Sequence, residues 1–253
     1  MHSAPRALIA GLGLIGGSIG MALRSRGWHV TFVDPNVDLH PAQRAGAADE
    51  RVDSLRADAD VIIIATPLNV AVELLRTQDS GLRTTSVTSV MEPLRAAAKN
   101  TNFIAGHPLA GSHERGLAAA RADLLRDRVW FLERHDELVD RVVHDCGARL
   151  EIVSADEHDA AVALTSHLPQ ILSTALAAYL EQHGTEKRFA GSGLETFLRL
   201  ASSDATVWSP VFAANRENLL PHIDQVIHIA RKILDGDTGP FGRAQAFMEK
   251  LRE

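Results

Sequence analysis

The residues best suited to acid–base chemistry are His107 and a possible partner, Ser89. His107 follows an apolar, β-rich run and lies between Gly106 and Pro108. A neutral imidazole whose pKa stays near its ordinary value of about 6.5 can accept a proton at neutral pH. Ser89 follows the preceding β-rich run, where it could hold the ring in one tautomer or, equally, cap the next helix. We therefore expect His107 to be a general base; the simpler alternative is a loop histidine bonded to backbone groups.

Two further residues, His167 and Arg199, lie in the second half of the chain. His167 falls on the apolar face of a predicted helix, beside Pro169, whose missing N–H predicts a kink. From residue type alone, a satisfied core histidine is the simpler interpretation of His167. Arg199 lies within the apolar stretch 197–201, so its charge is expected to need a carboxylate partner. That carboxylate belongs either to a substrate or to an aspartate of the protein.

A glycine-rich segment near the N-terminus has the pattern of a dinucleotide-binding loop. Gly11, Gly13 and Gly16 follow a short apolar run and open a helical stretch. The first glycine permits a tight turn, the second lets the backbone approach a pyrophosphate, and the third lets the helix pack closely on the strand. The backbone N–H groups at the start of the helix, including those of Leu14 and Ile15, are expected to face the diphosphate.

The type of dinucleotide is indicated by Asp34, which ends the second β-rich run, residues 29–33. It lies 21 residues after Gly13, where a carboxylate can accept a hydrogen bond from the ribose 2′-hydroxyl and repel a 2′-phosphate. The pattern therefore predicts NAD rather than NADP. A third β-rich run, 60–65, ends at Thr66, which we expect to contact the cofactor where the strand ends meet.

The elements that must position these residues alternate between β-rich and helical through the first 153 residues. This alternation predicts an α/β domain over residues 1–153, built on a Rossmann-type doubly wound sheet. The run Val61–Ile64 is apolar throughout, as expected for a parallel strand covered on both faces. The later candidate strands are residues 60–65, 84–88, 102–105, 129–132 and 149–153.

From residue 155 the apolar residues recur at helical spacing, so residues 154–253 are predicted to form an all-α C-terminal domain. Ser209 and Pro210 have the pattern of an N-cap followed by proline at the first helical position, and Asp235-Gly236 is a stop signal. The helix between them would be about 37 Å long. Its apolar face is broader than a small domain needs, which predicts a homodimer formed through this domain.

The composition narrows the classes of function. The chain has 253 residues, a net charge of -6 and no basic stripe, which argues against a nucleic-acid partner. Cys146 is the only cysteine, and the 12 histidines are scattered, so we expect no disulfide and no metal site. We expect no membrane segment, because no apolar stretch reaches about 18 residues and no signal segment begins the chain. These features predict a cytoplasmic enzyme that binds a small molecule.

Several motifs together resemble the prephenate/arogenate dehydrogenase family. They run in order along the chain: Gly11 to Ser18, His107 to Ser112, Ser166 to Pro169, Arg199 to Asp204, and Ala214 to Arg216. The resemblance implies a Rossmann domain, a helical dimerisation domain and an active site in the cleft between them. It further implies that His107 contacts the ring hydroxyl of a small anionic cyclohexadienyl substrate and that Ser89 orients His107. Arg199 would bind a substrate carboxylate, and His167 would line the same pocket.

The chain departs from the family pattern at five positions near the expected pocket. These are Ser86 and Met91 where aspartate and lysine are usual, His113 for glutamate, Gln170 for histidine, and Leu198 for threonine. We expect these changes to affect which substrate side chain is bound more than which reaction is catalysed.

The resemblance implies NAD-dependent oxidative decarboxylation of prephenate to 4-hydroxyphenylpyruvate, in tyrosine biosynthesis. The same motifs would serve arogenate or 4-amino-4-deoxyprephenate. A β-hydroxyacid dehydrogenase is a further alternative, but it is expected to carry a lysine on the first long helix of its second domain, and residues 156–180 contain none. A non-catalytic NAD-sensing protein that keeps the same fold is the alternative from another class.

Overall fold

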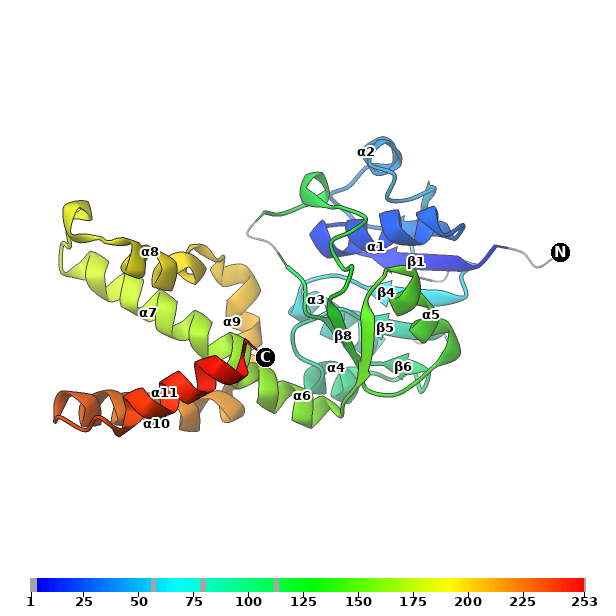
Figure 1. Cartoon of the computed structure of the whole chain (residues 1–253). Coiled ribbons are helices and arrows are strands. Elements are labelled where there is room, and N and C mark those ends of the chain that lie inside the picture. Colours follow the sequence, from blue (N-terminus) through cyan, green and yellow to red (C-terminus); the bar gives the residue numbers. More distant parts are fainter. Residues whose placement is uncertain (1–3, 56–57, 78–80, 112–113, 253) are drawn as a thin grey trace.

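A sheet domain and a helical domain make up the computed structural model, which describes residues 4–55, 58–77, 81–111 and 114–252 (Figure 1). The change from one to the other falls between Ile152, where the last strand ends, and Ala155, where the first helix of the helical domain begins. Asp34, His107 and Ser89 belong to the sheet domain, whereas His167 and Arg199 belong to the helical domain. A site made from all of them therefore has to lie at the junction.

The sheet domain is built on six parallel strands in the order β3-β2-β1-β4-β5-β6. The strands are β1 (Arg6–Ala10), β2 (His29–Val33), β3 (Glu50–Arg51), β4 (Val61–Ile64), β5 (Arg83–Ser86) and β6 (Phe103–Ile104). This is the strand order of a Rossmann sheet, so the predicted fold class is confirmed. The sequence pattern did not predict β3, which consists of two exposed polar residues and carries no apolar signal.

Helices cover both faces of this sheet. One core cluster contains alternate strand residues such as Ile9 and Ile63 and packs against α1 (Leu14–Ser25) and α5 (Glu137–Asp145). The other contains Leu8 and Ile62 and packs against α3 (Leu68–Thr77) and α4 (Glu92–Ala97). Because both faces are buried, the central strands are apolar throughout instead of alternating. A short helix, α2 (Leu39–Arg44), follows β2.

A second, three-stranded sheet holds His107. Its strands are β7 (Gly106–Pro108), β8 (Val129–Leu132) and β9 (Arg149–Ile152), with β8 antiparallel to β7 and parallel to β9. His107 follows β6, as expected, and lies within β7, opposite Phe131, so the alternative of a loop histidine is wrong. The strand pairing fixes the backbone of His107 more firmly than a loop would.

The helical domain begins with α6 (Ala155–Val162) and α7 (Leu168–Gln182), separated by the π-helical segment Ala163–His167. The predicted irregularity beside Pro169 is therefore present, and it places His167 at the end of a π-helical turn. The remaining helices are α8 (Ser192–Leu198), α9 (Ala205–Ala214), α10 (Arg216–Leu234) and α11 (Gly239–Lys250), and a 3₁₀ turn covers Arg199–Ser202.

The predicted helix start at Ser209-Pro210 is wrong. Asp204 caps α9 instead, since its carboxylate accepts a hydrogen bond of 2.7 Å from the backbone N–H of Thr206. Pro210 lies inside α9, and the helical run is interrupted at Asn215. The Ser-Pro signal was misleading because proline is tolerated within a helix when its neighbours still pack. The predicted stop at Asp235-Gly236 is confirmed, with Gly236 at φ +92°.

Residues 155–182 form one continuous helical run that is long and apolar enough to cross a membrane, judged by length and composition alone. The sequence-based expectation that no such stretch exists is therefore wrong. Helices buried in the core of soluble proteins often have the same composition. In this run Ala163, His167, Leu168 and Gln170 are buried inside the protein.

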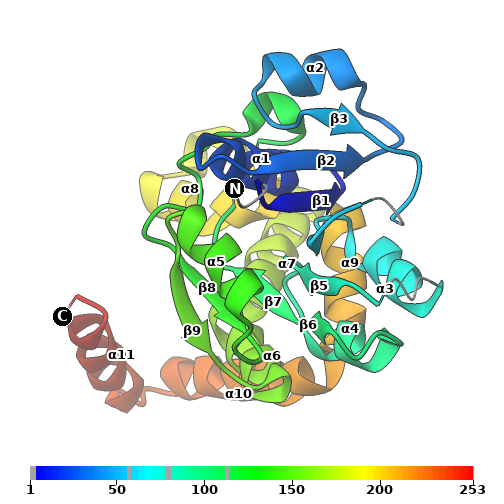
Figure 2. The ribbon, with the colours of Figure 1, turned by 90° about the vertical axis from the view of Figure 1, so that its right-hand side faces the viewer.

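Apolar side chains remain exposed along the last two helices. The exposed large side chains include Ile227, Ile233 and Leu234 of α10, and Phe241 and Phe247 of α11. Figure 2 shows α11 to one side of the other helices, and in Figure 1 it runs back from the far end of α10 toward the sheet domain. By contrast, a hydrophobic core cluster within the described helical domain has only three buried residues, Ala163, Leu168 and Leu219.

Candidate active site

The glycine loop has the geometry that the sequence predicted. Gly11 has φ +90°, and a Cβ atom there would lie 2.6 Å from the carbonyl oxygen of Ala65. A Cβ on Gly16 would lie 2.0 Å from the carbonyl oxygen of Gly11, so only glycine allows this close packing. Around Gly13 no atom lies within 4 Å of a Cβ position, which leaves its backbone open to a ligand.

The start of α1 is free to bind an anion. No side chain caps Gly13, and the first turn contains no acidic residue. The first N–H groups of a helix, here those of Leu14, Ile15 and their neighbours, have no partner inside the helix. They point out from its positive end, as a pyrophosphate-binding helix requires.

Asp34 and Thr66 lie beside this loop. The Asp34 carboxylate accepts hydrogen bonds from the backbone N–H of Leu12 (2.7 Å) and of Asn36 (2.8 Å). Each oxygen keeps a free lone pair that can accept from a ribose hydroxyl. Thr66, next to Gly11, has a buried hydroxyl oxygen that finds no partner among the described residues. The open backbone, uncapped helix, fixed carboxylate and unpartnered hydroxyl all fit NAD.

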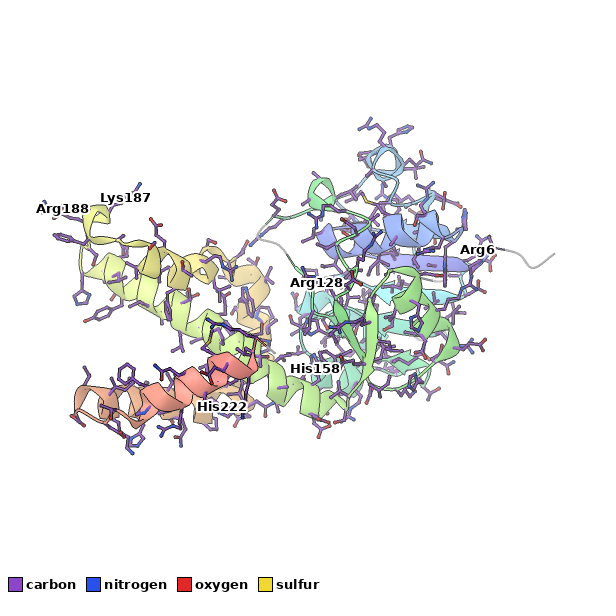
Figure 3. The ribbon with its side chains drawn as sticks, in the orientation of Figure 1. Arg6, Arg128, His158, Lys187, Arg188 and His222 are labelled. Atoms are coloured by element: carbon purple, nitrogen blue, oxygen red, sulfur yellow. The ribbon has the colours of Figure 1, made fainter. Side chains whose placement is uncertain are left out.

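A chain of three polar side chains ends at His107. Its Nδ1 lies 2.9 Å from Nε2 of His158, and Nδ1 of His158 lies 2.8 Å from Oδ1 of Asp159. The carboxylate of Asp159 also accepts the backbone N–H groups of Met91 (2.8 Å) and Glu92 (2.9 Å), where α4 begins. His158 and Asp159 are each 2% exposed. Figure 3 shows His158 on α6, where the helical domain meets the sheet domain.

The surroundings of His107 favour the neutral form of its ring. Burial, followed by the nearby rings of His158 and His167, lowers the pKa of His107 to about 3. The ring is therefore neutral at pH 7 and able to accept a proton. Its second nitrogen, Nε2, has no hydrogen bond to the described residues and is not sealed from solvent.

The structure gives no direct contact for the orienting role expected of Ser89. Across the described ranges of the chain, no hydrogen bond joins Ser89 to His107, whose ring instead contacts His158. The serine that does link β5 to β7 is Ser86, whose Oγ donates to the carbonyl of Gly106 at 3.3 Å and accepts from its N–H at 3.4 Å. The role of Ser89 stays a prediction.

His167 is fully buried, but only one of its two ring nitrogens forms a hydrogen bond with the described residues. Nδ2 of Asn215 donates to Nδ1 of His167 at 3.1 Å and to the carbonyl of Asp159 at 2.7 Å. Oδ1 of Asn215 accepts from Asn218 at 2.8 Å, which fixes the direction of the amide. Nδ1 of His167 is therefore an acceptor, and the proton of the ring is on Nε2, which is buried and has no partner in the described part of the chain. The interpretation of a satisfied core histidine is wrong for this nitrogen.

The proton on Nε2 makes this nitrogen of His167 a hydrogen-bond donor rather than a base. Burial lowers its pKa to about 4, with Asp159 opposing and His158 adding to the effect. At pH 7 the ring is neutral. Trp208 and Phe212 lie edge-on at 5.8 and 6.5 Å between ring centres and hold it in place. An unpaired buried donor costs roughly 1–3 kcal/mol, which an acceptor on a bound ligand would recover.

Arg199 is exposed, in contrast to the expectation from its apolar neighbours. Among the described residues it forms no ion pair, so the alternative of an aspartate partner within the chain is not met. The segment around it is fixed by Gln170, whose Nε2 donates to the carbonyl of Leu200 at 2.8 Å. Ser203 donates to Oε1 of the same glutamine at 3.2 Å. Gln170, one of the departures from the family pattern, thus has a structural role here.

Two of the other departures also have described surroundings. Met91 is buried, with its backbone N–H bonded to Asp159, and Leu198 is half-buried at the end of α8. His113 lies outside the described residues.

Sequence reasoning missed His158 and Asp159. The buried residues of α6 are Ala155, His158, Asp159 and Val162, which have the spacing of the inward stripe of an amphipathic helix. Two polar residues on such a stripe need partners inside the protein, and this was the signal that could have identified them.

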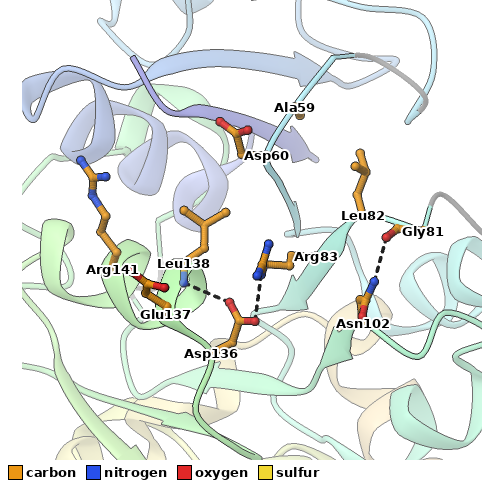
Figure 4. Close-up of a pocket in the computed structure, with 10 residues that line it drawn as sticks. All are labelled: Ala59, Asp60, Gly81, Leu82, Arg83, Asn102, Asp136, Glu137, Leu138 and Arg141. Atoms are coloured by element: carbon orange, nitrogen blue, oxygen red, sulfur yellow. Dashed lines mark hydrogen bonds and ion pairs between the residues drawn. The ribbon is translucent and has the colours of Figure 1, made fainter. Parts of the chain in front are cut away.

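A hollow of about 610 Å³ lies elsewhere, at the edge where the parallel strands begin (Figure 4). It is lined by residues such as Asp60, Arg83 and Asn102, which precede or begin β4, β5 and β6. Arg83 pairs with Asp136 at 2.9 Å, and Asp60 accepts the backbone N–H of Arg6. Ligands of such sheets bind at the opposite, carboxyl edge, so this hollow is not the candidate active site.

A dinucleotide loop at the carboxyl edge of the sheet and a neutral histidine at the domain junction are features of a nicotinamide-dependent oxidoreductase. Comparison with known proteins agrees with this class. A family model described as the nucleotide-binding domain of prephenate dehydrogenase matches residues 19–152. A second, described as the dimerization domain of prephenate dehydrogenase, matches residues 154–236. The chain is an NAD-dependent dehydrogenase and belongs to the prephenate dehydrogenase family.

Individual relatives support this assignment. The prephenate dehydrogenase of Lactococcus lactis is 30% identical over 260 residues, covering 91% of this chain and 72% of its own length. That of Bacillus subtilis is also 30% identical, covering 89% of this chain and 68% of its own. The structure of Aquifex aeolicus prephenate dehydrogenase in complex with hydroxyphenyl propionate and NAD⁺ superposes with a TM-score of 0.83. Its sequence is 24% identical and the match covers 99% of this chain and 98% of that one, so this similarity concerns the fold.

Proposed function

We propose that the chain catalyses the NAD-dependent oxidative decarboxylation of prephenate to 4-hydroxyphenylpyruvate. The observation that carries the proposal is the neutral His107 at the domain junction, with Nε2 free to take a proton. The relatives named prephenate dehydrogenase support this choice of substrate.

In the proposed reaction, His107 removes the proton of the C4 hydroxyl while the C4–H bond breaks and C4 becomes a carbonyl carbon. Bound NAD supplies the acceptor for the hydride from C4. The bond between the ring and its carboxylate then breaks, and its electron pair completes the aromatic ring as CO₂ leaves. The oxygen at C4 becomes a phenolate, and the proton held by His107 returns to it. No net proton is consumed or released.

Two other residues are proposed to position the substrate. Arg199 offers an exposed guanidinium without an internal partner, and a carboxylate binds such a group through two parallel hydrogen bonds. His167 offers its unpartnered Nε2–H to an oxygen of the bound ligand. Correct placement of the reacting atoms accounts for much of the rate that such a site can produce.

A homodimer is proposed as the working form. Residues 154–236 match a dimerization domain, and apolar side chains along α10 and α11 are left exposed by the residues that the structure describes. A surface of this kind is expected to pack against its copy. A cytoplasmic location remains a prediction from the sequence.

Arogenate and 4-amino-4-deoxyprephenate are the alternative substrates, because their rings could also lose a hydride from C4 and then the ring carboxylate as CO₂. A relative named cyclohexadienyl dehydrogenase, from Zymomonas mobilis, is 27% identical over 89% of this chain. This name supports the alternative that the chain accepts more than one cyclohexadienyl substrate.

The test is NADH formation by the purified protein with each of the three acids, with His107→Asn as the control. We expect turnover of prephenate at a higher kcat/KM than of the two amino analogues, and near-complete loss in the variant. A preference for arogenate would replace the proposed substrate and keep the reaction. No turnover of any of the three acids would exclude the reaction itself.

A further inference from the structure

We propose that His158 is a positioning residue which, held by Asp159, keeps His107 in the tautomer with its proton on Nδ1. This leaves Nε2 of His107 as the basic nitrogen. The role of His107 as the base rests on the proposed function. The positions of the protons follow from the hydrogen bonds of His107, His158 and Asp159 alone.

The argument starts from Asp159, which is buried and accepts three hydrogen bonds. The donors are the backbone N–H groups of Met91 and Glu92 and the Nδ1 of His158. Both backbone groups can only donate, and each carboxylate oxygen receives one of them. A carboxylate so occupied accepts from Nδ1 of His158, so that nitrogen carries a proton.

A neutral His158 then has a bare Nε2, which faces Nδ1 of His107 at 2.9 Å. Two bare nitrogens at that distance would repel one another, and two N–H groups would clash. Nδ1 of His107 must therefore donate, and its own Nε2 has no proton. If His158 were protonated on both nitrogens, it would donate to His107 instead and leave the base blocked. Nitrogen-15 NMR of the histidine rings distinguishes these two arrangements.

The rings are held by more than the hydrogen bonds. His158 lies edge-on to His107, with 5.1 Å between ring centres and an interplanar angle of 89°. It also lies edge-on to Phe131 at 5.5 Å, and Phe131 is opposite His107 in the strand pairing. The titratable groups near His107 are His158 and His167, with Asp159 beyond them. His158 therefore has one orientation available to it.

The arrangement also joins the two domains. His107 lies on β7 of the sheet domain, whereas His158 and Asp159 lie on α6 of the helical domain. Asp159 in turn binds the backbone at the start of α4, back in the sheet domain. The base is consequently set in its active tautomer only when α6 is docked on the sheet domain.

The experiment compares the full-length protein with His158→Phe and His158→Gln, and with His144→Phe as a control on the exposed side of α5. Phenylalanine keeps a ring against Phe131 but cannot accept a hydrogen bond, whereas glutamine offers an amide oxygen. Nitrogen-15 NMR of the histidine rings reports which nitrogen of His107 carries the proton. Activity with prephenate and NAD affinity are measured on the same samples.

We expect Nδ1–H in the wild type, in His158→Gln and in His144→Phe, and a shift toward Nε2–H in His158→Phe. Losing the correct tautomer should lower kcat by about 10²-fold or more, with NAD affinity unchanged and most of the activity restored in His158→Gln. A wild-type His107 with its proton on Nε2, or a His158→Phe variant with unaltered tautomer and kcat, would overturn the proposal. The NMR result needs no substrate, so it still decides the inference if prephenate is not turned over.

Discussion

Arg115 forms an ion pair with Asp204, and this contact connects the two domains. Arg115 lies between β7, which carries His107, and the following 3₁₀ turn, Leu117–Ala119, whereas Asp204 caps α9. The backbone N–H of Thr206, followed by the Arg115 guanidinium, lowers the pKa of Asp204 to about 2. The carboxylate therefore stays charged at any pH at which the enzyme would work. One turn further along α9 lies Trp208, against the ring of His167.

This ion pair should assist closure of the domains over the substrate and contribute little to stability. Half-exposed pairs add little to folding and are screened by salt. We expect Arg115→Gln to raise KM a few-fold while the thermal midpoint stays nearly constant. In about 0.5 M salt the wild type should approach the variant. A variant whose KM matches the wild type at low salt would show that the contact has no part in closure.

The cofactor preference should depend on Asp34. We expect kcat/KM to be higher with NAD than with NADP, and we expect Asp34→Ser to narrow the difference, because the carboxylate accepts from the 2′-hydroxyl and repels a 2′-phosphate. Asp38→Ser is a suitable control, since this aspartate is also close to the end of β2 but is largely exposed. Equal or better use of NADP by the wild type would contradict the assignment.

The two halves of the chain differed in how far their sequence predicted the structure. In the sheet domain the spacing predicted a tight turn at Gly11 and close helix–strand packing at Gly16, and a Cβ at either position would clash with backbone atoms. In the helical domain Ser209-Pro210 had an acceptable local pattern, but so had Asp204, which caps α9 through a bond to Thr206 only two residues away, and local pattern alone did not decide between the two. His158 was missed because its partner His107 is 51 residues away in the chain and adjacent only after folding.

Arg199 should bind a substrate carboxylate. Removing one partner of a buried charged pair in a complex typically costs about 2–5 kcal/mol, so Arg199→Ala should raise KM by tens- to thousands-fold. Arg188→Ala is the matched control, because Arg188 is also exposed on the helical domain but pairs with Glu186. The measurement is KM for prephenate with NAD saturating. An unaltered KM in folded Arg199→Ala would exclude Arg199 from the substrate site.

The helical domain should form the dimer interface. Ile233→Asp introduces a charge among the exposed apolar residues of α10, and light scattering should then show a larger monomer fraction than in the wild type. Val70→Asp, on the exposed side of α3 in the sheet domain, should leave the dimer intact. A wild type that is monomeric at micromolar concentration would contradict the prediction.

His107 should be the residue on which the chemical step depends. Asparagine at this position keeps a hydrogen-bonding group but cannot accept the proton, so His107→Asn should lower kcat by about 10²–10⁴-fold. NAD affinity should be unchanged, because the cofactor residues Gly13 and Asp34 are untouched. A variant within about threefold of the wild type would place the base elsewhere. His167 would be a poor substitute, since its Nε2, the nitrogen without a partner among the described residues, already carries a proton.

The pH dependence gives a separate test of the same residue. A histidine is a base only while neutral, and burial has lowered the pKa of His107 to about 3. Activity should therefore stay level as the pH falls from 7 to about 5, whereas a histidine of ordinary pKa would lose half of it near 6.5. The unfolded chain binds protons on His107 and His167 below about 6.5 and the folded chain does not, so stability should decrease as the pH falls through that range. Circular dichroism must accordingly confirm that the protein is folded at each pH. A half-loss of kcat/KM near pH 6.5 in folded protein would show that burial does not hold His107 neutral in the working enzyme.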